Sequence, residues 1–305
     1  MKSNSSSSSS TRRLLTAAAI VGLTASSVVS ATPETNATSA AGGATFGTIT
    51  SGSNKCVTGN PNAYISTQDP SEWNWNDLSN KNWIFDHLMK NKGSLNYCVR
   101  WDSDTKLTKS VASKFQAILN RQYKAWNQWL VGYDCWPYSQ IDVKIVGFAV
   151  KDKSQLDWSD DSLGKIYAGD LDSDGVPQCP QSCYRFYDNA AGAWADTSSC
   201  QDQVWDISLW PKQGLDGGFG DDWGQEVNLE NMLAALDNDQ LTIVAHEIGH
   251  GFGLPDFYEE ADMPNSNFPV CIMRAGSSMT ITPGDGWMLR RVWEHLKPRY
   301  NVWGF

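Results

Sequence analysis

Two histidines and a glutamate form the most chemically specific pattern in this chain. The stretch HEIGH runs from His246 to His250. On an α-helix these two residues lie one above the other, so both imidazoles can reach one metal ion at about 2.1 Å. Glu247 lies about 100° around the helix, where it can hydrogen-bond a metal-bound water without ligating the metal. The chain has only 4 histidines, so a zinc site is favoured over a chance match on an amphipathic helix.

The neighbouring residues favour the helix that this chemistry needs. A helix over 241–250 places four apolar residues on the side away from the histidines, where they would face a core: Leu241, Val244, Ala245 and Ile248. Asp237 and Gln240 resemble a capping signature just before that helix. Gly251 and Gly253 would let the chain leave the helix sharply.

Beyond the helix, the run HEIGHGFGLPD resembles the extended metzincin pattern HExxHxxGxxH, with aspartate in the last place as in small bacterial aspartate-type zincins. The stretch CIMRAGSS offers Met273 as a Met-turn, the methionine that metzincins place beneath the metal. Four stretches (GDLDSDG, HEIGHGFGLPDFY, IMRAGSS and WMLRRVWEHLKPRY) resemble a family of secreted fungal and bacterial zinc metallopeptidases over the C-terminal half. The resemblance implies that His246, His250 and Asp256 hold zinc and that Glu247 is the base. The chain departs from some metzincins at Ala275, where they have a tyrosine ligand.

A catalytic zinc needs a third protein ligand. The candidates are Asp256, Glu259, Glu260 and Asp262 nearby, and His87 and His295 farther away. A continued helix would place residue 254 above the histidines, so the ligand must follow a turn, which Gly253 permits and Pro255 enforces. We therefore expect Asp256, at the offset that the resemblance implies, with Glu259 and Glu260 solvated.

These residues predict a secreted zinc-dependent endopeptidase acting on protein or peptide substrates. Zinc would lower the pKa of its bound water towards 7, and Glu247 would take the proton as the water attacks a peptide carbonyl. Two alternatives stay open: a zinc hydrolase of a non-peptide bond, and a catalytically silent protein that binds wall carbohydrate through some of its 15 tryptophans. The intact Glu247 argues against a silent site, and the tryptophans can equally pack a core.

A second metal site is suggested by the stretch DLDSDG. Asp170, Asp172 and Asp174 alternate as at the start of a calcium-binding loop. Position twelve of such a loop falls on Gln181, where calcium requires a bidentate glutamate. A solvated turn is therefore an equal alternative to a Ca²⁺ site.

The N-terminus has the three-part form of a secretory signal over residues 1–31: basic residues, an apolar stretch and small residues before Thr32. The apolar stretch is short and diluted by Ser and Thr, which disfavours the alternative of a membrane anchor. Residues 32–55 are expected to form a flexible leader or short pro-segment, and residues 56–305 one metallopeptidase domain. Asn36 lies in a glycosylation sequon, consistent with secretion.

The cysteines and the charge agree with an extracellular protein. All 7 cysteines follow the signal, so we expect disulfide bonds with one cysteine left over. Cys56 could act as an inhibitory thiolate, but its surroundings lack the family pattern and favour a disulfide. The net charge of −10 disfavours nucleic acid and anionic membranes as partners. We expect a monomer.

The hydrophobic pattern predicts an α+β fold, and the resemblance implies that it is a metzincin-like zincin domain: a twisted mixed sheet with a long helix, the HExxH helix and a C-terminal helix behind it. We expect strands over 95–101, 141–150 and 204–210, loops over 151–203, and helices over 106–131, 241–250 and 286–300.

Overall fold

The computed structural model describes residues 78–258 and 268–303. The expected signal (1–31), the leader (32–55), Cys56, and the ligand candidates Glu259, Glu260 and Asp262 lie outside the described residues. Within the described ranges no helix is both long enough and apolar enough to cross a membrane.

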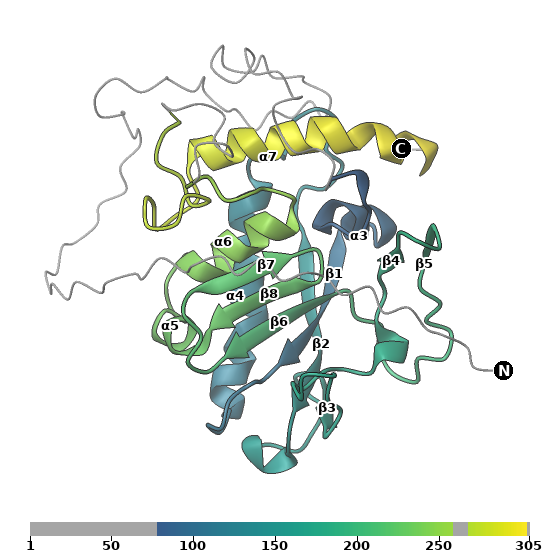
Figure 1. The fold of residues 1–305 in the computed structure, drawn as a ribbon, viewed down its shortest axis with the longest axis vertical. Helices are drawn as coiled ribbons and strands as arrows, with labels where there is room; N and C mark the ends of the chain where they lie inside the picture. Colours follow the sequence, from purple (N-terminus) through teal and green to yellow (C-terminus); the bar gives the residue numbers. More distant parts are fainter. Residues whose placement is uncertain (1–77, 259–267, 304–305) are drawn as a thin grey trace, which may run out of the picture.

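A six-stranded mixed sheet forms the centre of the described fold (Figure 1). Its strands are β1 (Ser94–Arg100), β2 (Asp142–Val150), β3 (Lys165–Ala168), β6 (Ile207–Lys212), β7 (Gly218–Asp221) and β8 (Gly224–Asn228). The order is β3-β2-β1-β6-β8-β7, with β7 antiparallel to β8 and the other pairs parallel. The expected α+β class with a mixed sheet is therefore confirmed, and the three predicted strands are β1, β2 and β6.

The burial of β2 shows how this part of the sheet is enclosed. Val143 and Ile145 are buried while Asp142 and Lys144 are exposed, and every residue from Val146 to Val150 is buried. Alternation indicates a strand covered on one face, whereas a continuous buried run indicates cover on both faces. The carboxyl half of β2 is therefore enclosed from both sides.

One face of the sheet is covered by α4 (Lys109–Asn127) and α6 (Thr242–Gly251). Phe115, Ile118, Leu119 and Trp126 make up a fully buried stripe on α4, and the Trp126 indole donates to the carbonyl of Ala245 on α6 at 2.9 Å. The helix α7 (Pro283–Leu296) crosses one end of the molecule beyond α6 (Figure 1) and continues as the 3₁₀ helix η4 (Lys297–Trp303). These three helices agree with the predicted ones. The shorter helices α3 (Ile84–Lys90) and α5 (Leu229–Ala234) were not predicted.

The other face of the sheet is partly covered by the long segment between β3 and β6. It contains η3 (Gln181–Cys183) and a small hairpin of β4 (Tyr187–Asp188) and β5 (Ala193–Trp194). Disulfides Cys98–Cys179 and Cys183–Cys200 tie this segment to β1 and to itself. Cys135 is also disulfide-bonded, and Cys271 is a free, buried cysteine. The segment therefore lacks much regular structure, as expected, and is fixed by covalent links.

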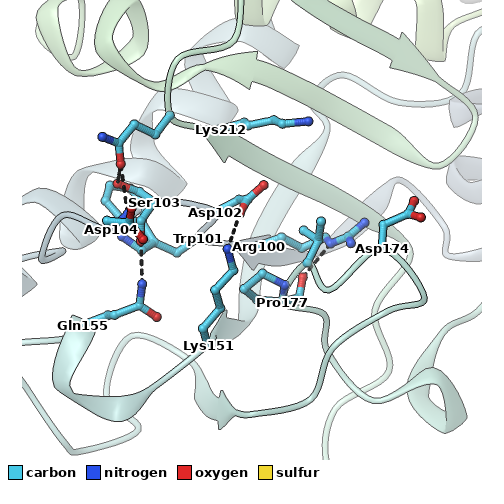
Figure 2. A network of polar contacts seen from close by, with 12 residues as sticks. Arg100, Trp101, Asp102, Ser103, Asp104, Lys151, Gln155, Asp174, Pro177 and Lys212 are labelled. Carbon is cyan, nitrogen blue, oxygen red and sulfur yellow. Dashed lines mark hydrogen bonds and ion pairs between the residues drawn. The ribbon is translucent and has the colours of Figure 1, made fainter.

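A polar network holds the carboxyl ends of β1, β2 and β6 together (Figure 2). Asp102 pairs with Lys151 at 3.0 Å and accepts a hydrogen bond from the Trp210 indole at 3.2 Å. Ser103 donates to Gln213 at 2.8 Å. Three segments far apart in sequence thus share one set of contacts just beyond the sheet.

Two details of the predicted helices are wrong. The long helix spans Lys109–Asn127, not 106–131, because Thr108 caps its first turn by accepting from Val111 N. The capping signature at Asp237 and Gln240 is not used: α6 starts after Leu241 and has no side-chain cap. Tertiary contacts replace the cap, since Gln122 accepts from Leu241 N at 3.0 Å and Gln240 accepts from Ile281 N at 2.9 Å.

Candidate metal centre

The imidazoles of His246 and His250 project from one face of α6, with their Nε2 atoms 3.1 Å apart. The opposite nitrogens are held by backbone carbonyls: Nδ1 of His246 lies 2.7 Å from Ile272 O, and Nδ1 of His250 lies 2.8 Å from Leu254 O. A carbonyl oxygen only accepts hydrogen bonds, so each Nδ1 carries the hydrogen. In the neutral rings both Nε2 atoms then present lone pairs to the same place, which is the tautomer of a metal ligand.

Asp256 brings a third lone pair to this place. Its Oδ1 lies 3.1 Å from His246 Nε2 and 3.4 Å from His250 Nε2. Despite these ion-pair distances, this buried oxygen has no hydrogen-bond partner of good geometry among the described residues. Ligand atoms about 2.0–2.1 Å from a tetrahedral ion lie about 3.3–3.4 Å from one another. Three acceptors at this spacing with no donor between them fit a bound cation.

The end of α6 explains how Asp256 reaches the histidines. Gly253 has φ +90°, its N–H bonds to His250 O at 2.7 Å, and Leu254 N bonds to Gly249 O at 3.1 Å. These two bonds form a Schellman motif, which reverses the chain after the last helical turn. The turn predicted at Gly253 is present. In the metal-free site, burial opposes the charge of Asp256, but the two imidazoles in their protonated form outweigh it and hold the pKa of this carboxyl well below its usual range; a cation bound between the three residues would act in the same direction.

Met273 lies directly beneath α6. A Cβ built at Gly249, inside the HEIGH stretch, would fall 2.3 Å from Met273 Sδ, and Met273 is completely buried. The same segment supports both sides of the site, because Ile272 O accepts from His246 and Met273 O accepts from Phe257 N at 2.9 Å. The residue proposed as a Met-turn therefore underlies the histidines.

Asp285, which was not predicted from the sequence, holds the backbone of Ile272 and Met273 in place. It is fully buried at the start of α7, and its carboxylate accepts from Ile272 N at 2.9 Å and Met273 N at 3.2 Å. It also accepts from the backbone and hydroxyl of Thr282, each at 2.7 Å. The Thr-x-x-Asp spacing is a capping-box signal that could have marked the start of α7, but not the contact with the turn.

Glu247 lies beside the three converging atoms. The ligand atoms of His246, Glu247 and His250 lie within 4.8 Å of one another, so this group could hold a metal ion. Glu247 Oε2 is 3.9 Å from His250 Nε2, farther than Asp256 Oδ1, and has no hydrogen-bond partner among the described residues. Burial raises the pKa of Glu247 to about 8. A cation in the site would lower that pKa.

Two glycines let the edge strand β7 pass next to this carboxylate. A Cβ at Gly218 would lie 2.5 Å from Glu247 Oε1, and a Cβ at Gly220 would lie 2.2 Å from Glu247 O. At Gly220 the clash is with helix backbone, so no side chain fits there, whereas at Gly218 the side chains of Glu247 and Ile243 would have to move. Within the glycine-rich segment 214–225, which gave no strand signal, these two glycines are therefore explained by close packing on α6.

The other candidate residues lie elsewhere. His87 is buried in α3 with Nδ1 3.6 Å from Asp206 Oδ1, and His295 lies in the last turn of α7. In the predicted calcium stretch, Asp172 accepts from Asp174 N at 2.9 Å and Val176 N at 3.0 Å and pairs with Arg100. Figure 2 shows Arg100 reaching the loop that carries Asp174. The Asp172 carboxylate is thus already engaged by its own turn and by a guanidinium, which favours a solvated turn over a calcium site. Calcium binding stays a prediction.

In comparisons with known proteins, no protein-family model, no curated protein and no solved structure matches this chain.

Proposed function

We propose that this protein is a secreted zinc-dependent endopeptidase of metzincin-like fold, with His246, His250 and Asp256 as zinc ligands and Glu247 as general base. The observation that carries the proposal is the convergence of three lone pairs, spaced 3.1–3.4 Å apart, beside a buried glutamate oxygen that has no hydrogen-bond partner among the described residues. Catalytic zinc sites have three protein ligands of this kind and leave a fourth position open.

The donor set favours zinc over other common ions. Two imidazole nitrogens and one carboxylate suit zinc, whereas Ca²⁺ and Mg²⁺ prefer sites built from oxygen atoms. Both imidazoles are held by backbone carbonyls, which fix their tautomer and orientation as the supporting residues of a metal site do. A bound zinc would supply Lewis-acid activation of water and of a carbonyl oxygen.

Glu247 lies where it could accept and later return the proton of the attacking water. Its Oε2 would accept a proton from the attacking water and later donate it to the leaving amine. The side chain is only 4% exposed, so few competing water molecules reach it, and burial keeps its proton affinity high. General-base residues of this kind contribute about 10²–10⁴-fold to the rate.

An extended peptide fits the free edge of β7. This strand closes one side of the sheet, so one edge of its backbone has no partner strand within the described sheet. Peptides commonly bind by adding a strand to such an edge. Because Gly218 and Gly220 bring β7 into contact with Glu247, a peptide paired there would pass beside the catalytic carboxylate.

The tryptophans give little support to the carbohydrate-binding alternative. Eight of them are buried: Trp101, Trp126, Trp136, Trp158, Trp205, Trp210, Trp287 and Trp293. Among the side chains whose burial is described, the exposed large hydrophobic residues include no tryptophan. These rings therefore pack the core. Secretion is supported by the disulfides, which form in oxidising compartments.

The test is hydrolysis of denatured casein by the purified protein, with and without a zinc chelator. The proposal expects hydrolysis that the chelator abolishes and zinc restores. Zinc binding without casein hydrolysis would favour a non-peptide bond, and no zinc binding would contradict the assigned site.

The variant Glu247→Gln isolates the proton transfer. It should retain zinc and fold but lose about 10²–10⁴-fold in casein turnover. Glu230→Gln, which removes the same charge from an exposed position on α5, is the matched control and should stay active. Near-normal turnover of Glu247→Gln would disprove the role of Glu247.

A further inference from the structure

Tyr258 contacts the proposed third ligand directly. Its hydroxyl donates a hydrogen bond of 2.6 Å to Oδ2 of Asp256, while Oδ1 of the same carboxylate faces the two imidazoles. The two carboxylate oxygens thus have different environments: one meets a phenol, the other meets two nitrogen lone pairs.

The backbone between the two residues is anchored. Phe257 is completely buried, its N–H bonds to Met273 O at 2.9 Å, and its ring packs against Phe268 at 5.3 Å. Tyr258 itself is 43% exposed. The phenol is therefore presented from a fixed backbone at the surface, next to the site and outside the core.

We propose that Tyr258 is a positioning residue for Asp256, which makes this aspartate a ligand through Oδ1 alone. The proposal rests on the proposed function in taking Asp256 as a zinc ligand. A carboxylate rotates freely about its last torsion and could present either oxygen, both, or neither. A short hydrogen bond to a charged acceptor is about twice as strong as a neutral one, so the phenol selects one rotation.

The role predicts a specific loss in metal affinity. Partners that hydrogen-bond a metal ligand typically contribute about 10–100-fold to metal affinity or activity. Tyr258→Phe removes only the hydroxyl and leaves the ring, so the fold should be retained. Tyr187→Phe is the matched control, because its hydroxyl bonds to Gly192 O at 2.7 Å, away from the metal ligands.

The experiment uses the purified full chain, stripped of metal. Zinc affinity is measured by competition with a chromophoric chelator, and the visible absorption of the Co²⁺-substituted protein reports ligand geometry. Tyr258→Phe should bind zinc about 10–100-fold more weakly and change the Co²⁺ spectrum, with the melting temperature of the metal-free protein unchanged. Tyr187→Phe should bind zinc as the wild type does.

A second variant shows whether Tyr258 acts through Asp256. In an Asp256→Ala background, Tyr258→Phe should cause no further loss of zinc affinity, because residues that act through one contact are not additive. An equal loss in both backgrounds would overturn the proposal. An unchanged zinc affinity of Tyr258→Phe would also overturn the proposal, provided that the wild type binds zinc and cleaves casein. Wild-type protein that fails to bind zinc would instead refute the proposed function, and this inference with it.

Discussion

Asp285 and Ile272 link the start of α7 to α6, the helix that carries His246 and His250. The Asp285 carboxylate accepts from Ile272 N at 2.9 Å, and the carbonyl of Ile272 accepts from His246 at 2.7 Å. The Ile272 carbonyl shares its peptide unit with Met273 N, which donates to the same carboxylate at 3.2 Å, so a buried carboxylate holds from the other side the peptide unit that orients His246. Through this chain of contacts, the end of the fold supports a residue of the site.

Asp285→Asn should reduce the free energy of unfolding of the metal-free protein by about 2–3 kcal/mol, because hydrogen bonds to a charged group contribute about 1.5–3 kcal/mol. The new amide would place a donor where backbone N–H groups need an acceptor. Denaturant unfolding measures the loss. Asp237→Asn, which breaks an exposed ion pair with Lys114, should cost at most about 1 kcal/mol. Equal stabilities of the two variants would contradict this role for Asp285.

The sequence predicts those parts of the site whose geometry is local. The spacing of His246, Glu247 and His250 follows from the helical period, and the turn at Gly253 follows from the backbone freedom of glycine. Asp285 and Tyr258 could not be assigned, because their roles depend on contacts with Ile272 and Asp256 that only the folded chain makes.

Strands β7 and β8 were not predicted from the sequence, for a related physical reason. Glycine weakens a strand, so the segment 214–225 gives no strand signal. Gly220 is nevertheless needed there, because β7 crosses α6 so closely that a Cβ would meet the helix backbone. The capping signature failed for the opposite reason, since a favourable local pattern lost to the contact of Leu241 with Gln122.

Gly220→Ala should destabilise the protein by about 1–3 kcal/mol and lower casein turnover, because overpacking displaces backbone. The added methyl would meet the carbonyl oxygen of Glu247 at 2.2 Å, and rigid helix backbone cannot yield there as a side chain could. Gly284→Ala is the control: its nearest contacts are at 3.4 Å or more, in a helix. A Gly220→Ala variant with wild-type stability and turnover would show that β7 and α6 can separate at no cost.

Cys271 should be the single free thiol of the purified protein, with the other six cysteines in disulfides. It is buried and free, whereas Cys98, Cys179, Cys183, Cys200 and Cys135 are disulfide-bonded. Burial raises the pKa of the Cys271 thiol, so it should resist alkylation in the native state. Alkylation after denaturation without reductant, followed by mass measurement, should add one label per chain. Two or more labels would contradict the disulfide assignment.

Asp222, in the turn after β7, should make stability fall as pH rises. Burial, reinforced by repulsion from Asp221, raises its pKa from 3.8 to about 6. Between these values the folded protein retains a proton that the unfolded chain has released. The contribution of this group to the free energy of unfolding therefore declines across that window, and the full penalty is present at pH 7.

Asp222→Asn removes this penalty. A shift of two pKa units corresponds to about 2.7 kcal/mol; because the side chain is partly exposed, we expect a gain of about 1–2 kcal/mol at pH 7 after discounting for solvent screening. Near pH 4, where Asp222 of the folded wild type is already neutral, the variant and the wild type should unfold at similar denaturant concentrations. Asp216→Asn, at an exposed position near the start of β7, should show no such divergence. If Asp222→Asn and wild type kept a constant difference in unfolding free energy from pH 4 to pH 7, the Asp222 carboxylate would not be the source of the pH dependence.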